Sequence, residues 1–344
     1  MKLGMVAGYS GKHIDLQLDK IKFAETLGYE TTWTAEAYGS DAVSPAAWIL
    51  ASTEKMKVGT AIMQMPGRTP ALAAMTAMTL NQLSKGRFIA GLGASGPQVV
   101  EGWHGIPYGR PITRTREYIA VMRKIMAREG PATFEGHHYN LPYKGDDSTG
   151  LGKPLKSILA ADTNIPIYTA SITPNGVACA AEIADGFFPV WMNPERYDIF
   201  ADDVQKGLDK SGRTLEQFDI APFVTCIMGD NLDACRMPVK GMMALYIGGM
   251  GARSKNFYND YAVKLGYADE AKKIQDLYLD GKKAEAMAAV PDALVDDIAL
   301  IGPKERIKER LQVWKEAGKK GHVGSMLIGA AQNEVLELIA EEML

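Results

Sequence analysis

The residue types that most often carry enzyme chemistry are few in this chain and are not grouped. His137 and His138 are adjacent, so on one strand they would point to opposite faces, and the other three histidines are scattered. The three cysteines have neither the spacing of a zinc site nor that of a disulfide framework. Neither a Gly-x-Ser-x-Gly motif nor a P-loop occurs. We therefore expect no metal site, and an enzyme built on this chain would depend on an organic cofactor.

One glycine-rich motif, residues 91–96, fits the pattern G-x-G-x-x-G of dinucleotide-binding proteins. That fingerprint opens a helix and is followed about 20 residues later by an acidic residue that ends the next strand. Here Pro97 and Gly102 interrupt the helix, and the acid at the right distance, Glu117, lies inside a predicted helix. We interpret the glycines instead as a strand end where a ligand can lie close to the backbone.

Apolar runs that suit strands alternate along the chain with amphipathic segments that suit helices. We expect these elements to position the strand ends where such a ligand would bind. Strand patterns begin near residues 2, 30, 57 and 87, a spacing of about 28 residues that is typical of parallel βαβ units. Further strand patterns cover residues 165–170, 186–190, 219–228 and 322–328, each followed by a helical pattern. Eight such units predict an α/β fold, a (β/α)8 TIM barrel, and the alternative is an open doubly wound sheet.

Two segments interrupt this repeat. Residues 131–164, after strand four, are rich in Gly, Pro, Asp and Lys and are interpreted as an inserted loop that could cover the site. Residues 232–300, after strand seven, are helical with little strand signal. No linker-like tract separates two domains, so we expect residues 1–344 to form a single TIM-barrel domain with these two insertions.

The composition argues against several classes of function. There are 38 basic and 41 acidic residues, a net charge of −3, so the chain lacks the basic character of a nucleic-acid-binding protein. The longest uncharged run, residues 163–181, contains two prolines and cannot span a bilayer. The N-terminus lacks the apolar segment of a secretory signal. We expect a cytoplasmic protein with no nucleic-acid or membrane partner.

In a (β/α)8 barrel the reactive groups lie at the carboxyl ends of the strands and in the loops that follow them. Glu36 follows strand two, and a partly buried carboxyl there could have a raised pKa and act as a catalytic proton donor. Alternatively, Glu36 is a structural carboxylate bonded to the backbone or to Arg68. The side chains that would line a substrate pocket at this mouth, or would only pack there, are Tyr9, Trp103, His104 and Trp191.

Several segments at these strand ends resemble the luciferase-like superfamily of flavin- and deazaflavin-dependent (β/α)8 barrels. The likeness is closest to the branch that uses coenzyme F420, which includes methylenetetrahydromethanopterin reductase and F420-dependent glucose-6-phosphate dehydrogenase. Residues 83–95 (LSKGRFIAGLGAS) are the most specific part. The segments that carry the resemblance are residues 34–41 (TAEAYGSD), 58–103, 114–119 (RTREYI), 165–175 (IPIYTASITPN) and 181–189 (AEIADGFFP).

The resemblance implies where the cofactor ring would lie. In the superfamily the ring rests against a bulge with a non-prolyl cis peptide at the end of strand three, and the matching bond is Ala61-Ile62. Gln64 matches a position that reaches the polar edge of the ring. Glu36, after strand two, would also face the cofactor.

The resemblance also implies contacts for the cofactor tail and its phosphate. The tail would lie against the residues after strand four, which are Ala94, Ser95 and Gly96. The phosphate would bind in the loop after strand five, at Ala170, Ser171, Ile172 and Thr173. That position suits an anion, because the free N–H groups and the dipole at a helix N-terminus attract negative charge.

The chain departs from the sugar-phosphate dehydrogenases of this branch, which place an Asp-His pair where this sequence has Glu36-Ala37. A sugar phosphate is therefore a poor substrate. The resemblance implies an oxidoreductase that transfers a hydride between coenzyme F420 and a small organic substrate, a carbonyl, imine or activated alkene. The alternatives are an FMN-dependent luciferase-like monooxygenase and a non-catalytic deazaflavin- or flavin-binding protein. Relatives are often dimers, so a homo-oligomer is expected.

Overall fold

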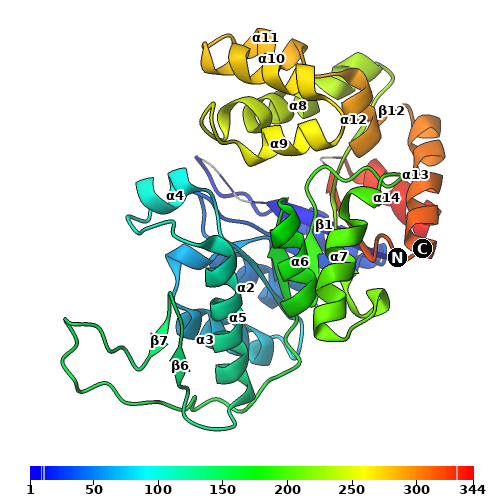
Figure 1. Cartoon of the computed structure of the whole chain (residues 1–344). Coiled ribbons are helices and arrows are strands. Elements are labelled where there is room, and N and C mark those ends of the chain that lie inside the picture. Colours follow the sequence, from blue (N-terminus) through cyan, green and yellow to red (C-terminus); the bar gives the residue numbers. More distant parts are fainter. Residues whose placement is uncertain (9, 11, 331) are drawn as a thin grey trace.

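A parallel sheet forms the centre of the molecule in the computed structural model, which describes residues 1–8, 10, 12–330 and 332–344. Figure 1 shows helices surrounding this sheet. Eight barrel positions follow from the strand pairing, because β3 and β4 share one position and so do β10 and β11. The strands are β1 (Lys2–Gly8), β2 (Thr31–Thr34), β3 (Lys57–Thr60), β4 (Met63–Gln64), β5 (Phe88–Gly93), β8 (Ile167–Ala170), β9 (Gly186–Phe188), β10 (Asp219–Ile220), β11 (Phe223–Met228) and β13 (Ser325–Ala330).

The sheet closes at the barrel position that β10 and β11 share, because these two strands pair with different neighbours. β10 pairs with β9, whereas β11 pairs with β13, which in turn pairs with β1. Ala221 and Pro222 separate β10 from β11, and Pro222 has no N–H to donate to a neighbouring strand. The (β/α)8 barrel predicted from the sequence is therefore confirmed, and the open doubly wound sheet is wrong.

Helices follow the strands in the order expected for this fold. Several begin with proline at the first position, where the missing N–H has no helical partner to lose. One of them is the short helix α4, which begins at Pro97 and ends at Gly102. We expected these two residues to interrupt a helix, and that expectation is wrong. The helices of the repeat are α1 (Leu18–Thr26), α2 (Val43–Ser52), α3 (Pro70–Leu83), α4 (Pro97–Gly102), α5 (Pro111–Ala127), α6 (Pro174–Ile183), α7 (Asp198–Ser211), α13 (Lys304–Lys319) and α14 (Asn333–Met343).

The two insertions differ in character. Residues 131–164 contain a small antiparallel hairpin, β6 (Phe134–Glu135) and β7 (Asn140–Leu141), and an arm that projects from the molecule at the lower left of Figure 1. Residues 232–300 contain α8 (Leu232–Ala244), the π-helix η3 (Leu245–Gly249), α9 (Phe257–Lys264), α10 (Ala268–Leu279), α11 (Lys283–Ala288) and α12 (Asp292–Ile298). The sequence had little strand signal there, but β12 (Leu300–Gly302) pairs with the end of β11.

Large apolar side chains fill the inside of the barrel, among them Trp33, Tyr168 and Phe188. Trp33 lies over Gly59, where a Cβ would be 2.2 Å from the indole ring, and its N–H donates to Thr31. The interior is thus a packed core, and a ligand has room only at its ends. Among the described residues, no helix has the length and apolar character needed to cross a membrane.

Candidate active site

The end of strand three has the backbone that the resemblance predicts. The Ala61-Ile62 peptide bond is cis, and it separates β3 from β4. Beyond it, Met63 pairs with Leu92 of β5. Ile62 lies over Gly93, where a Cβ would be 2.8 Å from the Ile62 side chain. Ala61 and Ile62 are half-buried, so this bulge leaves apolar surface at the mouth of the barrel.

The neighbouring strand ends carry the residues predicted for the cofactor tail and phosphate. Ala94, Ser95 and Gly96 follow β5 and are half-buried. β8 pairs with β5, so the loop of residues 170–173 lies at the next position of the barrel. Thr173 caps α6 and accepts the N–H of Gly176 at 3.2 Å. These segments therefore lie side by side at one edge of the mouth.

The loop before α6 is shaped by a close contact. A Cβ at Gly176 would be 1.9 Å from Oγ of Ser171, so only glycine lets that hydroxyl lie over the first turn of the helix. Gly176 is buried, whereas Ser171 and Thr173 are half-buried. Two hydroxyl groups thus accompany the N–H groups of the helix N-terminus, a donor set that suits a phosphate.

Glu36 is an ion-pair partner in this structure. Its side chain is 8% exposed, and both carboxylate oxygens bond to the guanidinium of Arg68. The N–H of Ala42 donates to it at 2.9 Å and the N–H of Gln64 at 2.7 Å. Each carboxylate oxygen thus accepts one N–H from Arg68 and one from the backbone. These contacts are those of the structural carboxylate, and the role of Glu36 as a proton donor stays a prediction.

Asp41 holds the segment that carries Glu36. Its carboxylate accepts the N–H groups of Val43 and Ser44 at the start of α2, at 2.9 and 2.8 Å. Burial alone would raise the pKa of Asp41. The N–H donors, the Ser44 hydroxyl and the Arg68 guanidinium outweigh burial and hold that pKa below its usual value. The loop after strand two is therefore held by two carboxylates around one arginine.

Gln64 connects this ion pair to His104. The side chain of Gln64 is buried, its amide N–H donates to the carbonyl oxygen of Ala37 at 2.7 Å, and its amide oxygen lies 2.8 Å from Nε2 of His104. Both ends of the amide therefore contact protein atoms. Gln64 therefore holds the end of β4 against the loop after β2 and against His104, and its contact with a cofactor ring stays a prediction.

Of the four side chains expected to line a pocket, the three that the structure describes lie in different surroundings. Tyr9 lies outside the described residues. Trp103 is 67% exposed at the end of α4. His104 contacts the segment after β4, whereas Trp191 is buried beside the helical insertion.

Trp191 belongs to a group of aromatic rings that sequence reasoning missed. Its ring centroid lies 6.1 Å from that of Tyr246 and 5.6 Å from that of Tyr258. Asn256 holds both tyrosines, since its amide N–H donates to the carbonyl oxygen of Tyr246 and its oxygen accepts the N–H of Tyr258. Burial raises the pKa of Tyr258, so its phenol stays protonated. This group joins the insertion to the end of strand six.

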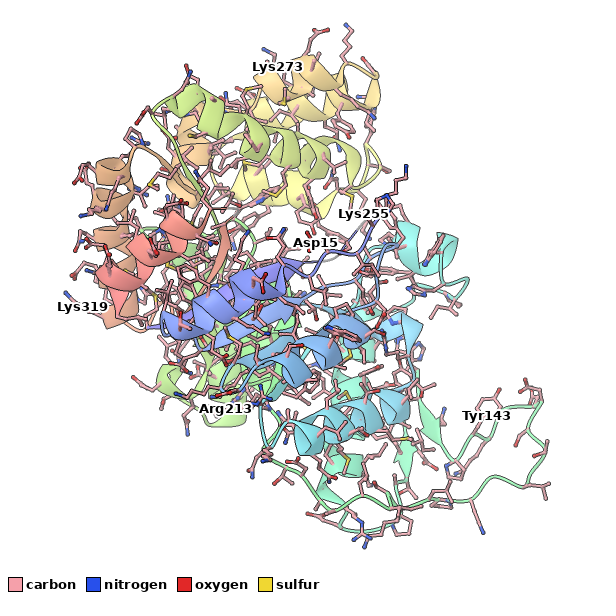
Figure 2. All side chains as sticks on the ribbon, turned by 180° about the vertical axis from the view of Figure 1, so that it is seen from behind. Asp15, Tyr143, Arg213, Lys255, Lys273 and Lys319 are labelled. Atoms are coloured by element: carbon pink, nitrogen blue, oxygen red, sulfur yellow. The ribbon has the colours of Figure 1, made fainter. Side chains whose placement is uncertain are left out.

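Two cavities of about 270 Å³ lie at this end of the barrel. One follows the ends of β1 and β13 and is lined by residues that include Val6, Gly8, Asp15 and Ala330. Asp15 marks that region in Figure 2, and Tyr143 marks the projecting arm.

The other cavity lies between the segment after β4 and the hairpin of the first insertion. Gly67, Arg68, Ile106 and Tyr139 are among its lining residues, and burial raises the pKa of Tyr139 to about 12. Among the described residues that line this cavity, the first insertion contributes Tyr139 of its hairpin. Its arm extends away from the strand ends and does not cover them.

In the part of the chain that the structure describes, no group of three or more His, Cys, Asp or Glu side chains could hold a metal ion. All three cysteines are free and buried.

The closed barrel and its strand-end site define an enzyme fold of the luciferase-like type. The chain belongs to the luciferase-like monooxygenase family, whose model matches residues 2–320. A Mycobacterium tuberculosis protein provisionally named a coenzyme F420-dependent oxidoreductase is 41% identical over 99% of this chain and 98% of its own length. The 5,10-methylenetetrahydromethanopterin reductase of Archaeoglobus fulgidus is 25% identical over 100% and 99%. The resemblance recognised in the sequence is thus confirmed.

Solved structures agree on the fold. The coenzyme F420-dependent tetrahydromethanopterin reductase of Methanopyrus kandleri superimposes with a TM-score of 0.78, covering 99% of this chain and 97% of that one, at 21% identity. At that identity the likeness shows the (β/α)8 barrel and not the activity.

Proposed function

We propose that this protein transfers a hydride between coenzyme F420 and a small organic substrate. One observation carries the proposal: the cis Ala61-Ile62 bulge, the loop at Ala94–Gly96 and the N-terminus of α6 occupy consecutive strand ends. Such a surface offers an apolar face for a flat ring and, at one side, N–H and hydroxyl groups for a phosphate. The name given to the relative that is 41% identical supports the same cofactor.

The chain's own part in such a reaction is to hold and orient. Ala61 and Ile62 would support one face of the ring, Ala94, Ser95 and Gly96 would contact the tail, and the residues of the α6 loop would hold the phosphate. These last residues are Ala170, Ser171, Ile172 and Thr173. Coenzyme F420, when bound, supplies or accepts the hydride. Fixing the ring with one face toward the substrate provides the proximity on which the rate depends.

The substrate that we propose is a small carbonyl compound, imine or activated alkene. The mouth lacks the Asp-His pair of the sugar-phosphate dehydrogenases, since Glu36-Ala37 stands there and Glu36 is paired with Arg68. The aromatic group of Trp191, Tyr246 and Tyr258 borders strand six and favours an apolar substrate.

Titration of the purified protein with oxidised coenzyme F420 and, separately, with FMN tests the proposal. We expect micromolar or tighter binding of coenzyme F420 and weaker binding of FMN. Binding of neither would overturn the cofactor assignment. Preference for FMN, together with oxygen consumption when reduced FMN is added, would favour the monooxygenase alternative. Binding of coenzyme F420 without oxidation of its reduced form by any carbonyl, imine or alkene would favour the non-catalytic alternative.

We also propose a homodimer that forms through α2 and α3. These helices expose Trp48, Leu72 and Met75, which are 64%, 48% and 54% accessible. A second apolar surface, on the helical insertion, fits this role less well, because its Met243 is fully buried. The methionines of that surface are Met237, Met242, Met243 and Met250. A Trp48→Asp variant should behave as a monomer in light scattering, and an unchanged mass would direct the search to another face.

A further inference from the structure

The His104 imidazole contacts an amide whose orientation can be assigned. Gln64 is 2% exposed, and its amide nitrogen lies 2.7 Å from the carbonyl oxygen of Ala37. A backbone carbonyl can only accept a hydrogen bond. The NH2 end of the Gln64 amide must therefore face Ala37, and the oxygen end must face His104. The reversed amide would set two oxygen atoms against each other.

This orientation determines which nitrogen of His104 carries a proton. The amide oxygen of Gln64 lies 2.8 Å from Nε2 of His104, so Nε2 must hold a hydrogen to donate. Nδ1 then carries the lone pair of the neutral ring, and no described residue forms a hydrogen bond with it. In both charge states the Nε2–H bond to Gln64 remains.

His104 lies in a loop at the mouth of the barrel. His104 follows α4, in the connection after strand four, and its Cε1 lies 3.0 Å from where a Cβ on Gly67 would be. Gln64, its partner, is two residues beyond the cis peptide at Ile62. The imidazole is half-buried. It therefore lies beside the end of β4, in the same connection after β5 that carries Ala94, Ser95 and Gly96.

We propose that His104 exchanges the proton that accompanies hydride transfer, with Gln64 as its positioning residue. The inference rests on the proposed function. In carbonyl reduction, the carbonyl carbon gains the hydride with its electron pair, and the C=O π pair moves to oxygen. That oxygen takes the proton from Nδ1–H of the imidazolium, and His104 is left neutral with Nε2–H still bonded to Gln64. Water then restores the proton, and in the oxidative direction Nδ1 accepts it.

The charged groups around His104 are few. Behind Gln64 lies the Glu36–Arg68 pair, because the Gln64 backbone N–H donates to Glu36. On the preceding helix α4, the carboxylate of Glu101 accepts the N–H of Tyr108 at 3.2 Å. We expect proton exchange at Nδ1 to give the pH profile of kcat one limb that depends on His104.

The first test needs no substrate. Nitrogen-15 NMR of the imidazoles, with His104 identified by its loss in the His104→Asn variant, reports which ring nitrogen is protonated. We expect Nε2 to stay protonated through the whole titration and Nδ1 to titrate, and we expect oxidised coenzyme F420 to shift the Nδ1 resonance. The matched control is His322, which stacks on Tyr197 with ring centroids 4.0 Å apart, before strand β13 begins. Its resonances should not move when the coenzyme is added.

The second test measures rates with reduced coenzyme F420 and 2-cyclohexen-1-one as the probe. His104→Asn should lower kcat by about 100-fold or more and should remove the limb that depends on His104 from the pH profile of kcat. The Kd for the coenzyme should change less than about twofold. Gln64→Met should flatten or move the limb, and His322→Asn should leave it intact. Two results of the NMR test would overturn the proposal even if the enone is not turned over. One is a neutral ring that is protonated at Nδ1, and the other is an Nδ1 resonance that does not shift when the coenzyme is added. Failure of the wild type to bind coenzyme F420 would instead refute the proposed function.

Discussion

Replacing Glu36 by glutamine distinguishes an ion-pair partner from a proton donor. The carboxylate accepts N–H groups from Arg68, Ala42 and Gln64. Glutamine keeps the shape of the side chain but replaces one oxygen with an NH2 group, which must then face another donor. Glu36→Gln also removes the counter-charge of Arg68. Both effects destabilise the fold, because a mostly buried donor and a mostly buried cation lose their partner.

The size of the effect follows from the burial of the pair. The side chains of Glu36 and Arg68 are 8% and 17% exposed. Removing one partner from such a pair costs about 3 kcal/mol, the lower end of the range for buried pairs, because Arg68 keeps some contact with water. The entropy of unfolding is about 2.1 cal/mol/K per residue, so 344 residues give about 0.7 kcal/mol per degree. We therefore expect Tm to fall by about 4 °C.

Thermal unfolding followed by circular dichroism at pH 7 measures this shift. The control is Glu135→Gln, whose wild-type carboxylate is 77% exposed and bonds to Lys144 at the surface; it should show no measurable change. If Glu36→Gln unfolds at the wild-type temperature, the ion-pair reasoning is refuted. That result would favour the alternative in which Glu36 is the catalytic proton donor.

Three further substitutions test other parts of the structure. Gly91→Ala should give little soluble, folded protein, as measured by yield and circular dichroism, because the new Cβ would lie 1.7 Å from the carbonyl oxygen of Thr60. The Arg116 guanidinium holds the pKa of Glu182 below its usual value, so that pair stabilises the fold at neutral pH and its contribution is lost as the pH falls through the lowered pKa. Glu182→Gln should lower the free energy of unfolding by about 1 kcal/mol at pH 7, and the difference should close below the usual glutamate pKa of about 4. Thr173→Ala should remove the cap of α6, at a cost of about 1 kcal/mol, and should raise the Kd for coenzyme F420 about tenfold in a binding titration.

Two of these substitutions have a matched control variant, and pH serves as the control for Glu182→Gln. Gly102→Ala meets no atom within 4 Å and should fold normally, and equal yields from both glycine variants would contradict the packing argument. A stability loss in Glu182→Gln that persists at pH 3 would show that charge is not its cause. Thr214→Ala removes the capping box of the 3-10 helix η2 (Leu215–Gln217), far along the chain from the proposed phosphate site. It should affect stability without changing the Kd.

The barrel could be predicted from the sequence because its strands recur at one spacing and each precedes an amphipathic helix. The elements that were missed are short. β12 is three apolar residues directly after α12, and β6 and β7 are two residues each, which is too little for any periodicity to show. The helix α4 was missed for a different reason. Pro97 stands at its first position, where proline starts a helix and does not interrupt it.

The candidate site could be predicted only as a set of strand ends. The predicted strand order brings Glu36, Gln64 and Arg68 to the same mouth of the barrel. Gln64 lies 28 positions after Glu36 and Arg68 lies 32 positions after it, and their bonds to Glu36 become visible only in the folded structure. Gln64 and His104 are 40 positions apart. Which of two reasonable roles a side chain takes depends on such contacts, and these depend on loop conformations that carry no periodic pattern.

The pairing of β12 with β11 has a consequence for how this protein can change. Met228 is the register partner of Gly302, and the N–H of Gly229 donates to the carbonyl oxygen of Gly302 at 3.0 Å. The chain therefore leaves and re-enters the barrel at almost the same point, and inserted segments are tolerated where their ends lie so close. The five α-helices α8 to α12, together with the π-helix η3, form a segment whose two ends meet at the pairing of β11 with β12. A chimera that carries another family member's segment in place of residues 230–299 keeps β12 and should accept different substrates. We expect its barrel to unfold at the Tm of the wild type, and a lower Tm would contradict this.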